Sequence, residues 1–377
     1  MTEKIKVIFC TDGIFPYSIG GMQRHSRLLI ETISKNNNIE IIVLHPHDKK
    51  VFSADLSLTE IQVTPINTSK NYLLECYRYS KRIYDIVIKY PDYLIYSQGL
   101  CIWYNIKYLR KRTIINPHGL EPYQAVSIKD KLIALPFIFV FNYLFKYATV
   151  IISLGGKLTD ILKNKIKDPG KIVVIPNAIL SQGENIDKKF RSDKTNLLFI
   201  ARFAHNKGIH ILMKAIQNLN RKGYKNKLEF YLGGGGPLFN FYSNSFKIEN
   251  VHYLGFIPDQ ELFELYKTKD IFVLPTLFEG MPTVVLEAMS YGLPVIVSDV
   301  GATGEIVDHE NGYLIQKNSV QQLMDSIVQF HESNNSEKKR MSLKSIEKVE
   351  SKFTWKMVSF QHALLFEKMM VSIHYQK

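Results

Sequence analysis

Short apolar runs alternate with longer amphipathic segments along nearly the whole chain. Apolar runs bounded by Gly, Pro or Asn predict buried strands, and apolar residues three or four apart predict helices. In the first half, helices are predicted at residues 22–34, 72–90 and 131–148. The strands predicted around them are residues 5–10, 39–44, 61–65, 93–97, 113–116, 150–153 and 171–176. This alternation predicts a parallel sheet covered on both faces.

A second series of the same kind follows residues 181–195, which are polar and show neither a strand nor a helix period. We interpret these residues as a linker. Helices are predicted beyond it at residues 210–222, 260–268 and 320–330, and one more begins just after Thr283. The strands predicted there are residues 196–200, 227–232, 251–254, 271–275, 294–298 and 313–315. Two α/β series joined by a linker predict two Rossmann-like domains.

Length and composition agree with this organisation. The chain has 377 residues and is 46% hydrophobic, enough for two domains that each have a core. Cys10, Cys76 and Cys101 show no metal or redox spacing, so we expect buried free thiols and a reducing, cytoplasmic environment. We recognise neither a signal peptide nor an apolar run of about 18 residues that would predict a membrane span.

The formal net charge of +13 is uneven. Residues 1–178 carry 24 Lys and Arg against 14 Asp and Glu, whereas the remaining residues carry 24 against 21. A basic half favours an anionic partner such as a phosphate, a nucleic acid or an acidic lipid, and a merely solvated lysine-rich surface is the alternative. We expect no nucleic acid, because no recognisable nucleic-acid-binding module is present.

Residues 275–295 carry the strongest chemical signal. Glu279 and Glu287 are eight positions apart, and the break between them predicts a loop whose last residue, Thr283, caps a helix. A helix start binds phosphate through its N–H groups and dipole, and a nearby carboxylate can accept two vicinal sugar hydroxyls. The segment therefore predicts a nucleotide-sugar site; an amphipathic helix with solvated glutamates is the alternative. The candidate residues are Glu279, Gly280, Met281, Pro282, Thr283 and Glu287.

Three more predicted strands end in candidate residues. Arg202 and Lys207 follow the strand at 196–200, where two cations can neutralise a diphosphate and stabilise the charge of a leaving group. His118 follows the strand at 113–116 and can exchange a hydrogen bond with a sugar hydroxyl. Gly20 and Gly21 follow the first strand and allow a ligand to approach the backbone closely. A solvated basic loop, a structural histidine and a tight turn are the respective alternatives.

The phrase from Glu279 to Glu287 resembles the E-x7-E signature of retaining glycosyltransferases of family 4, which have the GT-B fold. Arg202 to Gly208 resembles the family's G-R-x(4)-K-G phrase, with Ala201 in place of its glycine. Gly235 lies in a run similar to the family's glycine-rich turn, and Ile257 matches the position beside the nucleobase. The resemblance implies an α/β chain with two Rossmann-like domains facing each other across a cleft. Residues 1–180 would bind the acceptor and 181–352 the nucleotide-sugar, and a last helix at 353–377 would pack back on the first domain.

The resemblance further implies a retaining, metal-independent glycosyltransferase without a cofactor. Arg202 and Lys207 would hold the diphosphate and Glu287 the ribose, while Glu279 and the N–H groups of residues 280–283 would hold the donor sugar. His118 would contact that sugar from the other side, and the Gly20–Gly21 pair would close over the diphosphate. Family frequency favours a UDP-sugar that carries a hexose or an N-acetylhexosamine.

The acceptor is less closely defined. The basic, aromatic first half and the apolar residues 132–147 favour a glycan or a polyprenyl-phosphate-linked acceptor at the inner membrane face. They also favour peripheral contact with an anionic membrane and a role in surface-polysaccharide or lipopolysaccharide biosynthesis. A sugar-nucleotide epimerase of the same fold and a non-catalytic glycan- or nucleotide-binding protein remain alternatives.

Overall fold

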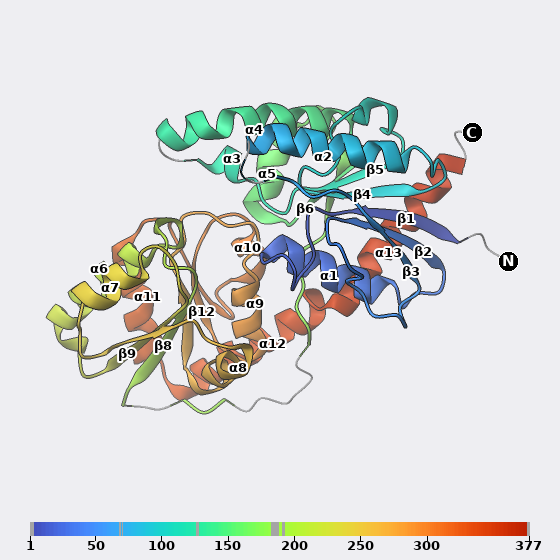
Figure 1. Cartoon of the computed structure of the whole chain (residues 1–377). Helices are drawn as coiled ribbons and strands as arrows, with labels where there is room; N and C mark the ends of the chain where they lie inside the picture. The colour runs from blue at the N-terminus through green and yellow to red at the C-terminus, as the bar shows by residue number, and fades with distance from the viewer. Residues whose placement is uncertain are drawn as a thin grey trace. The chain divides into compact units, whose positions relative to one another are not determined.

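The computed structural model describes residues 4–67, 69, 71–125, 128–181, 188–190 and 193–374. The chain divides into two compact units. The first unit comprises Met1–Ala178 and Trp355–Lys377, and the second comprises Ile179–Thr354. Each unit contains one parallel sheet, and helices connect most of its successive strands (Figure 1).

The sheet of the first unit has the strand order β3-β2-β1-β4-β5-β6-β7. Its strands are β1 (Ile5–Cys10), β2 (Ile39–His45), β3 (Leu58–Gln62), β4 (Leu94–Gln98), β5 (Thr113–Asn116), β6 (Val150–Ser153) and β7 (Ile172–Val174). The central strands β1, β4, β5 and β6 are almost completely buried because helices cover both faces of the sheet. The strand order reverses between β1 and β4, and ligands of open α/β sheets bind at the carboxyl ends of strands beside such a point.

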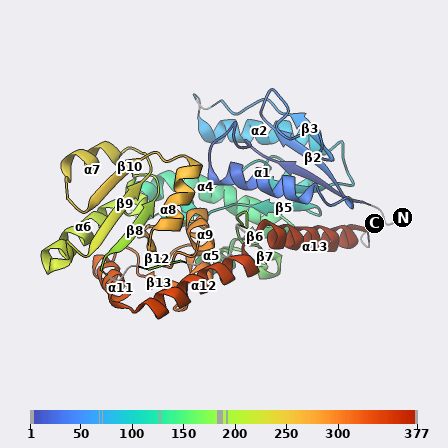
Figure 2. The same ribbon diagram turned by 90° about the horizontal axis from the view of Figure 1, so that it is seen from below.

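The helices of the first unit lie on both faces of this sheet. They are α1 (Gly21–Ile33), α2 (Tyr72–Val87), α3 (Glu121–Gln124), α4 (Ile128–Tyr147), α5 (Gly156–Lys165), α13 (Trp355–His374) and the short turns η1 (Ile106–Tyr108) and η2 (Pro169–Lys171). Helices α1 and α13 lie side by side on one face, and Leu29, Trp355 and Phe366 share one apolar core with β1 and β4 (Figure 2). The C-terminal helix is thus a component of the first unit's core.

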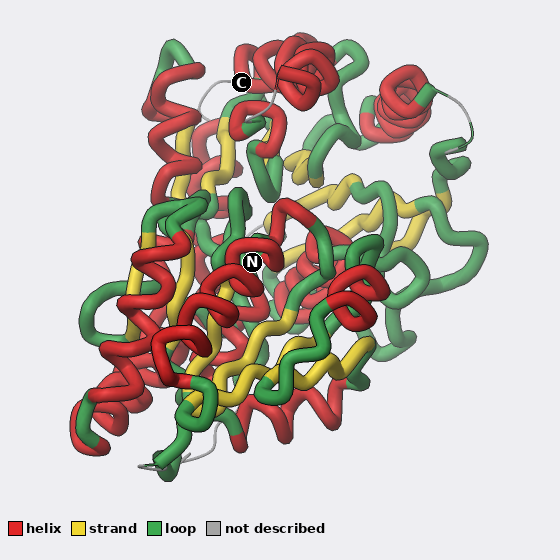
Figure 3. The backbone as a smooth tube through the Cα atoms, turned by 90° about the vertical axis from the view of Figure 1, so that its left-hand side faces the viewer, coloured by secondary structure: helices red, strands yellow, loops and turns green. Residues whose placement is uncertain are grey.

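The second unit has a six-stranded sheet in the order β10-β9-β8-β11-β12-β13. Its strands are β8 (Thr195–Ile200), β9 (Leu228–Gly233), β10 (Val251–Gly255), β11 (Ile271–Leu274), β12 (Val295–Ser298) and β13 (Gly312–Ile315). Its helices are α6 (Ile209–Leu219), α7 (Phe239–Ser245), α8 (Asp259–Thr268), α9 (Thr283–Ser290), α10 (Thr303–Ile306), α11 (Val320–Glu332) and α12 (Asn335–Lys352), with short turns η3 (His205–Lys207) and η4 (Asn220–Tyr224). Helices flank the strands of this unit in the tube view (Figure 3). Its strand order reverses between β8 and β11.

Two predictions about local structure were wrong, and several helices were not predicted. The strand predicted at residues 61–65 lies earlier, at Leu58–Gln62, because it is an edge strand whose polar side chains are only partly covered. Thr283 does not cap a helix: it is the first residue of α9, and Pro282 occupies the cap position without a side-chain hydrogen bond. Helix α12 was not predicted, because it is rich in Lys, Glu and Ser and buries only a narrow stripe.

The predictions about the cysteines, the linker and membrane spans have different outcomes. All three cysteines are free and buried, as predicted. Much of the predicted linker at residues 181–195 falls outside the described residues, and β8 already begins at Thr195. In the part of the chain that is described, no helix is both long and apolar enough to cross a membrane.

Candidate functional site

The candidate residues of the second unit lie where its strand order reverses. Strands β8 and β11 are neighbours and pair in parallel. Arg202 and Lys207 follow β8, and Glu279 follows β11, so these side chains lie on loops at the carboxyl edge of the sheet. This is the position at which open α/β sheets bind ligands.

Lys207 and Glu279 form the centre of this group. The Lys207 ammonium donates a hydrogen bond to Glu279 Oε1 over 2.6 Å. The Glu279 side chain is 10% exposed and that of Lys207 is 24% exposed, so a ligand can still reach the cation. An ammonium carries three N–H donors, and one contact with Glu279 leaves capacity for phosphate oxygens. The pair therefore places a cation for phosphate directly beside an acceptor for sugar hydroxyls.

Hydrogen bonds to a backbone carbonyl and a close backbone approach fix the distance between the loops that carry this pair. Thr276 Oγ1 and the Leu277 N–H both donate to the Asn206 carbonyl oxygen, over 2.9 and 2.8 Å. Gly208 follows Lys207 with a left-handed φ of +73°, and a Cβ at this position would lie 1.8 Å from the Pro275 carbonyl oxygen. Only glycine combines that backbone angle with so close an approach. The β8 loop is thus held against the end of β11.

A third loop supports Glu279 from the other side. The Ala302 N–H, after β12, donates to the Gly280 carbonyl oxygen over 2.9 Å. Met281 and Pro282 are buried and lead directly into α9. The first N–H groups of a helix have no acceptor within the helix, so the start of α9 can bind an anion. Thr283, the first residue of that helix, is partly exposed.

Glu287 lies about one turn into α9 and keeps part of its side chain accessible. The buried Tyr266 hydroxyl of α8 donates to Glu287 Oε2 over 3.3 Å. Burial and the Glu287 charge raise the pKa of Tyr266 well above its usual value, so the phenol remains a donor. This contact holds Glu287 while its carboxylate can still accept hydroxyl groups.

The glycine-rich loop after β9 lies next to the loop that carries Arg202. The Phe203 N–H donates to the Gly235 carbonyl oxygen over 2.7 Å, which holds this loop against the one that carries Arg202. Arg202 and Gly235 are exposed, and a Cβ added to Gly235 would meet no atom within 4 Å. Ile257 packs beside Gly233, the last residue of β9. Ala201 has no left-handed backbone angle, so its substitution for the family's glycine causes no strain.

In the first unit, His118 follows β5 with a left-handed φ of +59°, which is uncommon for a residue other than glycine. Its ring Nε2 contacts Gln98 Oε1 and therefore carries the proton, so Nδ1 presents a lone pair. Burial and the nearby His362 lower the pKa of His118 to about 3, and the ring is neutral near pH 7. A neutral ring with a lone pair at Nδ1 can accept a hydrogen bond from a sugar hydroxyl.

In the first unit, α1 begins at Gly21, and Gly20 is its N-cap residue. Gly20 has an extended φ of 162° and is close only to the flexible side chain of Gln23. Gly21 is exposed, and a Cβ there would meet no atom within 4 Å. Neither position requires glycine for the fold, which differs from the situation at Gly208.

Sequence reasoning missed four residues around these groups, namely Gln98, Asn116, Tyr96 and Tyr266. Gln98 and Asn116 are polar residues that end buried strands, and the rule that found His118 could have found them. Tyr96 and Tyr266 are buried aromatic residues that no local pattern distinguishes from core residues.

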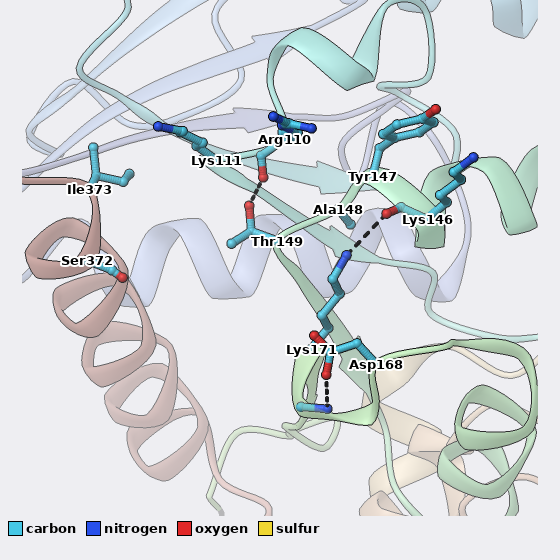
Figure 4. A pocket seen from close by; sticks show the side chains of 11 residues that line it. Arg110, Lys111, Lys146, Tyr147, Ala148, Thr149, Asp168, Lys171, Ser372 and Ile373 are labelled. Carbon is cyan, nitrogen blue, oxygen red and sulfur yellow. Dashed lines mark hydrogen bonds between the residues drawn. The ribbon is translucent and has the colours of Figure 1, made fainter. Parts of the chain in front are cut away.

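A separate basic hollow of about 640 Å³ lies in the first unit (Figure 4). Its cationic residues are Arg110, Lys111, Lys146 and Lys171. The segments that carry Lys111, Thr149 and Lys171 precede β5, β6 and β7, so the hollow is at the amino edge of the sheet, opposite His118. Among the described residues, no three His, Cys, Asp or Glu side chains gather closely enough to bind a metal ion.

Solved structures show the same fold. Sucrose-phosphate synthase from Thermosynechococcus elongatus superposes with a TM-score of 0.78 at 17% identity, covering 98% of this chain and 100% of that chain. Anabaena HepE in complex with UDP and glucose superposes with a TM-score of 0.66 at 16% identity, covering 96% and 99%. The two parallel sheets with interleaved helices therefore form the GT-B fold that the sequence predicted.

Sequence relatives agree with this fold. An uncharacterised glycosyltransferase of Methanocaldococcus jannaschii is 26% identical over 355 residues, covering 90% of this chain and 92% of the relative. The Escherichia coli UDP-Gal:alpha-D-GlcNAc-diphosphoundecaprenol alpha-1,3-galactosyltransferase is 27% identical over 228 residues, covering 56% and 58%. Residues 19–180 match the model of glycosyltransferase family 4, and residues 182–348 match that of glycosyl transferases group 1. The chain therefore belongs to the family 4, group 1 glycosyltransferases, enzymes with the GT-B fold.

Proposed function

We propose that the protein is a retaining glycosyltransferase that moves a hexose or N-acetylhexosamine from a nucleotide-sugar to a glycan or lipid-linked acceptor. The observation that carries this proposal is the Lys207–Glu279 pair at the point where the strand order of the second unit reverses. A nucleotide-sugar presents a diphosphate next to a polyhydroxylated ring, and the pair offers a cation next to a carboxylate.

In this proposal, different residues of the second unit bind different parts of the donor. Arg202 and Lys207 bind the diphosphate, and Glu279 with the N–H groups of residues 280–283 binds the sugar. Glu287 accepts the ribose hydroxyls, and the open space at Gly235 and Ile257 receives the base. In the first unit, the Nδ1 lone pair of His118 accepts a hydrogen bond from the donor sugar, and Gly20 and Gly21 lie close to the diphosphate.

In the proposed reaction, the bond from the anomeric carbon to the phosphate oxygen breaks. A bond from that carbon to the acceptor hydroxyl forms on the same face of the sugar, and the hydroxyl proton passes to the leaving phosphate. The departing diphosphate gains negative charge, and Arg202, Lys207 and the start of α9 stabilise it. These groups supply the positive charge that a metal ion would otherwise provide.

Two similarities support a UDP-sugar and a lipid-linked acceptor. The structurally similar Anabaena protein was solved with UDP and glucose, and the Escherichia coli relative is named for transfer from UDP-Gal to a diphosphoundecaprenol-linked sugar. We propose that this chain likewise uses a UDP-sugar and acts in surface-polysaccharide or lipopolysaccharide biosynthesis.

A donor screen with a matched variant tests this function. The wild-type protein is incubated with UDP-, GDP- and ADP-sugars and an undecaprenyl-diphosphate-linked sugar, and the anomeric configuration of the product is read by NMR. We expect product with the donor's configuration, and Lys207→Ala should lower turnover by about 100-fold or more. Lys214→Ala, at an exposed position on α6, is the control. An inverted product, or equal turnover in the two variants, would contradict the proposal.

We further propose peripheral contact between the first unit and an anionic membrane. Helix α4 exposes Ile128, Leu132 and Phe139 to the extent of 80%, 67% and 67%, and its last turn contributes Lys146 to the basic hollow. Apolar side chains next to several cations suit an interface with anionic lipid, where each charge contributes about 1 kcal/mol.

Vesicle flotation tests this contact. Binding to vesicles with anionic lipid should exceed binding to neutral vesicles and weaken at high salt. Phe139→Gln should reduce it, whereas Phe360→Gln, at an exposed aromatic residue of α13, should not. Equal, negligible flotation with both kinds of vesicle would exclude the contact.

A further inference from the structure

Three side chains and two backbone groups form a continuous series of hydrogen bonds from β5 to the C-terminal helix of the first unit. The His118 N–H donates to Asn116 Oδ1 over 3.0 Å, and Asn116 Nδ2 donates to Tyr96 Oη over 3.0 Å. Tyr96 Oη lies 2.9 Å from His362 Nε2, and His362 Nδ1 lies 2.8 Å from the Val358 carbonyl oxygen. Asn116, Tyr96 and His362 are at most 1% exposed.

The two backbone groups at the ends of this series determine which atom is the donor in each of its hydrogen bonds. The backbone N–H of His118 can only donate, so the Asn116 oxygen faces it and the Asn116 amide group faces Tyr96. The Val358 carbonyl can only accept, so His362 carries its proton on Nδ1 and presents a lone pair at Nε2. Tyr96 therefore accepts from Asn116 and donates to His362. Each of these side chains therefore has a donor or acceptor of the right kind at both of its ends.

His118 needs such support because of its backbone. A left-handed conformation costs a residue with a side chain about 1–2 kcal/mol, and it persists only when surrounding contacts hold it. The contact between the Asn116 side chain and the His118 N–H stabilises this turn, and it requires the orientation that Tyr96 gives to Asn116. The His118 ring also packs edge-to-face with the His25 ring, and their centroids are 4.7 Å apart.

We propose that His362, acting through Tyr96 and Asn116, is a positioning residue that holds the His118 loop in its reactive conformation. This inference rests on the proposed contact of His118 with the donor sugar. It assigns the C-terminal helix a part in catalysis, although His362 itself contacts no substrate.

The test uses two phenol-to-phenyl substitutions in the same unit. Tyr96→Phe removes only the hydroxyl of the chain, and the ring keeps its packing against Phe9 and Phe366. Tyr79→Phe is the matched control, because Tyr79 is equally buried and donates to the Thr11 carbonyl oxygen over 2.5 Å. We expect Tyr96→Phe to lower kcat about tenfold and Tyr79→Phe to change it less than about twofold. The UDP affinity should be unchanged in both variants.

Variants of His362 add a rescue and a coupling test. A glutamine can accept the Tyr96 proton, so His362→Gln should retain more activity than His362→Leu. The double variant Tyr96→Phe/His362→Leu should lose no more than the worse single variant, since both changes break the same chain. Equal loss in the Gln and Leu variants, or additive losses in the double variant, would overturn the proposal.

Imidazole ¹⁵N NMR separates this inference from the proposed function. In the wild-type protein, His118 should show a protonated Nε2 and an unprotonated Nδ1, and Tyr96→Phe should shift or broaden both signals. Changed signals in a protein that consumes no nucleotide-sugar would refute the proposed function and leave the hydrogen-bonded chain standing. Unchanged signals in an active protein would refute the positioning role and leave the proposed function standing.

Discussion

Replacing Gly208 by alanine should lower the stability of the second unit and disturb the proposed donor site. The new Cβ would lie 1.8 Å from the Pro275 carbonyl oxygen, where real Cβ atoms stay at least 3.0 Å away. The loops must therefore separate by roughly 1.2 Å, an overpacking that costs about 1–3 kcal/mol. The left-handed φ of +73° adds about 1–2 kcal/mol for any residue with a Cβ. The expected loss of unfolding free energy is about 2–5 kcal/mol in total.

Gly223→Ala isolates the strain from the clash. Gly223 lies just beyond the other end of α6 with a φ of +90°, and a Cβ there meets no atom within 4 Å. It should lose only the strain of about 1–2 kcal/mol. The difference between the two variants, measured by denaturant unfolding, is the cost of the contact with Pro275.

Nucleotide binding completes this test. Separation of the loops breaks the bonds to the Asn206 carbonyl and moves Lys207 away from Glu279. Calorimetric titration with UDP should therefore show at least about tenfold weaker binding for Gly208→Ala and unchanged binding for Gly223→Ala. If the two variants unfold at the same denaturant concentration and bind UDP equally, the contact at Pro275 does not organise the site.

Three further predictions follow from the same geometry. Glu287→Gln should weaken UDP binding about 10-fold in a titration, because a neutral amide accepts hydroxyl protons less strongly; binding equal to wild type would remove Glu287 from the site. Gly235→Ala should leave the thermal unfolding midpoint unchanged, since its Cβ would contact no other atom of the protein. It should weaken UDP binding, because the Cβ would occupy space proposed for the base. A lowered midpoint would show that the fold itself requires this glycine. Burial lowers the pKa of His362 to about 4 in the folded protein, whereas it is near 6.5 in the unfolded chain. Between pH 6.5 and pH 4 the unfolded chain therefore binds more protons, and the free energy of unfolding falls as the pH falls. His362 alone should lower the free energy of unfolding by about 2 kcal/mol between pH 7 and pH 5, measured by denaturant unfolding. His362→Gln should show a smaller decrease, and an equal decrease in both proteins would exclude His362 as its source.

Much of the fold was predictable because buried parallel strands are continuous apolar runs. The strand at β5 was predicted at its observed bounds, and those at β8 and β11 to within one residue at either end. The same runs located Arg202, Lys207 and Glu279, because a polar residue just after such a strand lies at the carboxyl edge of the sheet. The sequence also predicted that these ends belong to one site, through the resemblance of their phrases to one family.

The contacts that arrange the site were not predictable from local patterns. Lys207 and Glu279 are 72 positions apart, and Tyr96 and His362 are 266 positions apart. A pattern within a window of about 18 residues contains no information on such pairs. The edge strand β3 was misplaced and helix α12 was not predicted for another reason: little of either element is buried, so polar side chains dominate their sequences.

The glycines around the candidate groups separate two kinds of requirement. At Gly208 and Gly301, an added Cβ would meet a backbone carbonyl oxygen at 1.8 and 2.2 Å, so the fold itself excludes a side chain. At Gly21 and Gly235, an added Cβ would meet nothing within 4 Å, and neither has a left-handed backbone angle. The fold gives no reason for glycine at these two exposed positions. A ligand that approaches the backbone closely would give one, because only glycine leaves room for it. We therefore propose that the substrate approaches the backbone at Gly21 and Gly235, whereas Gly208 and Gly301 hold the loops together.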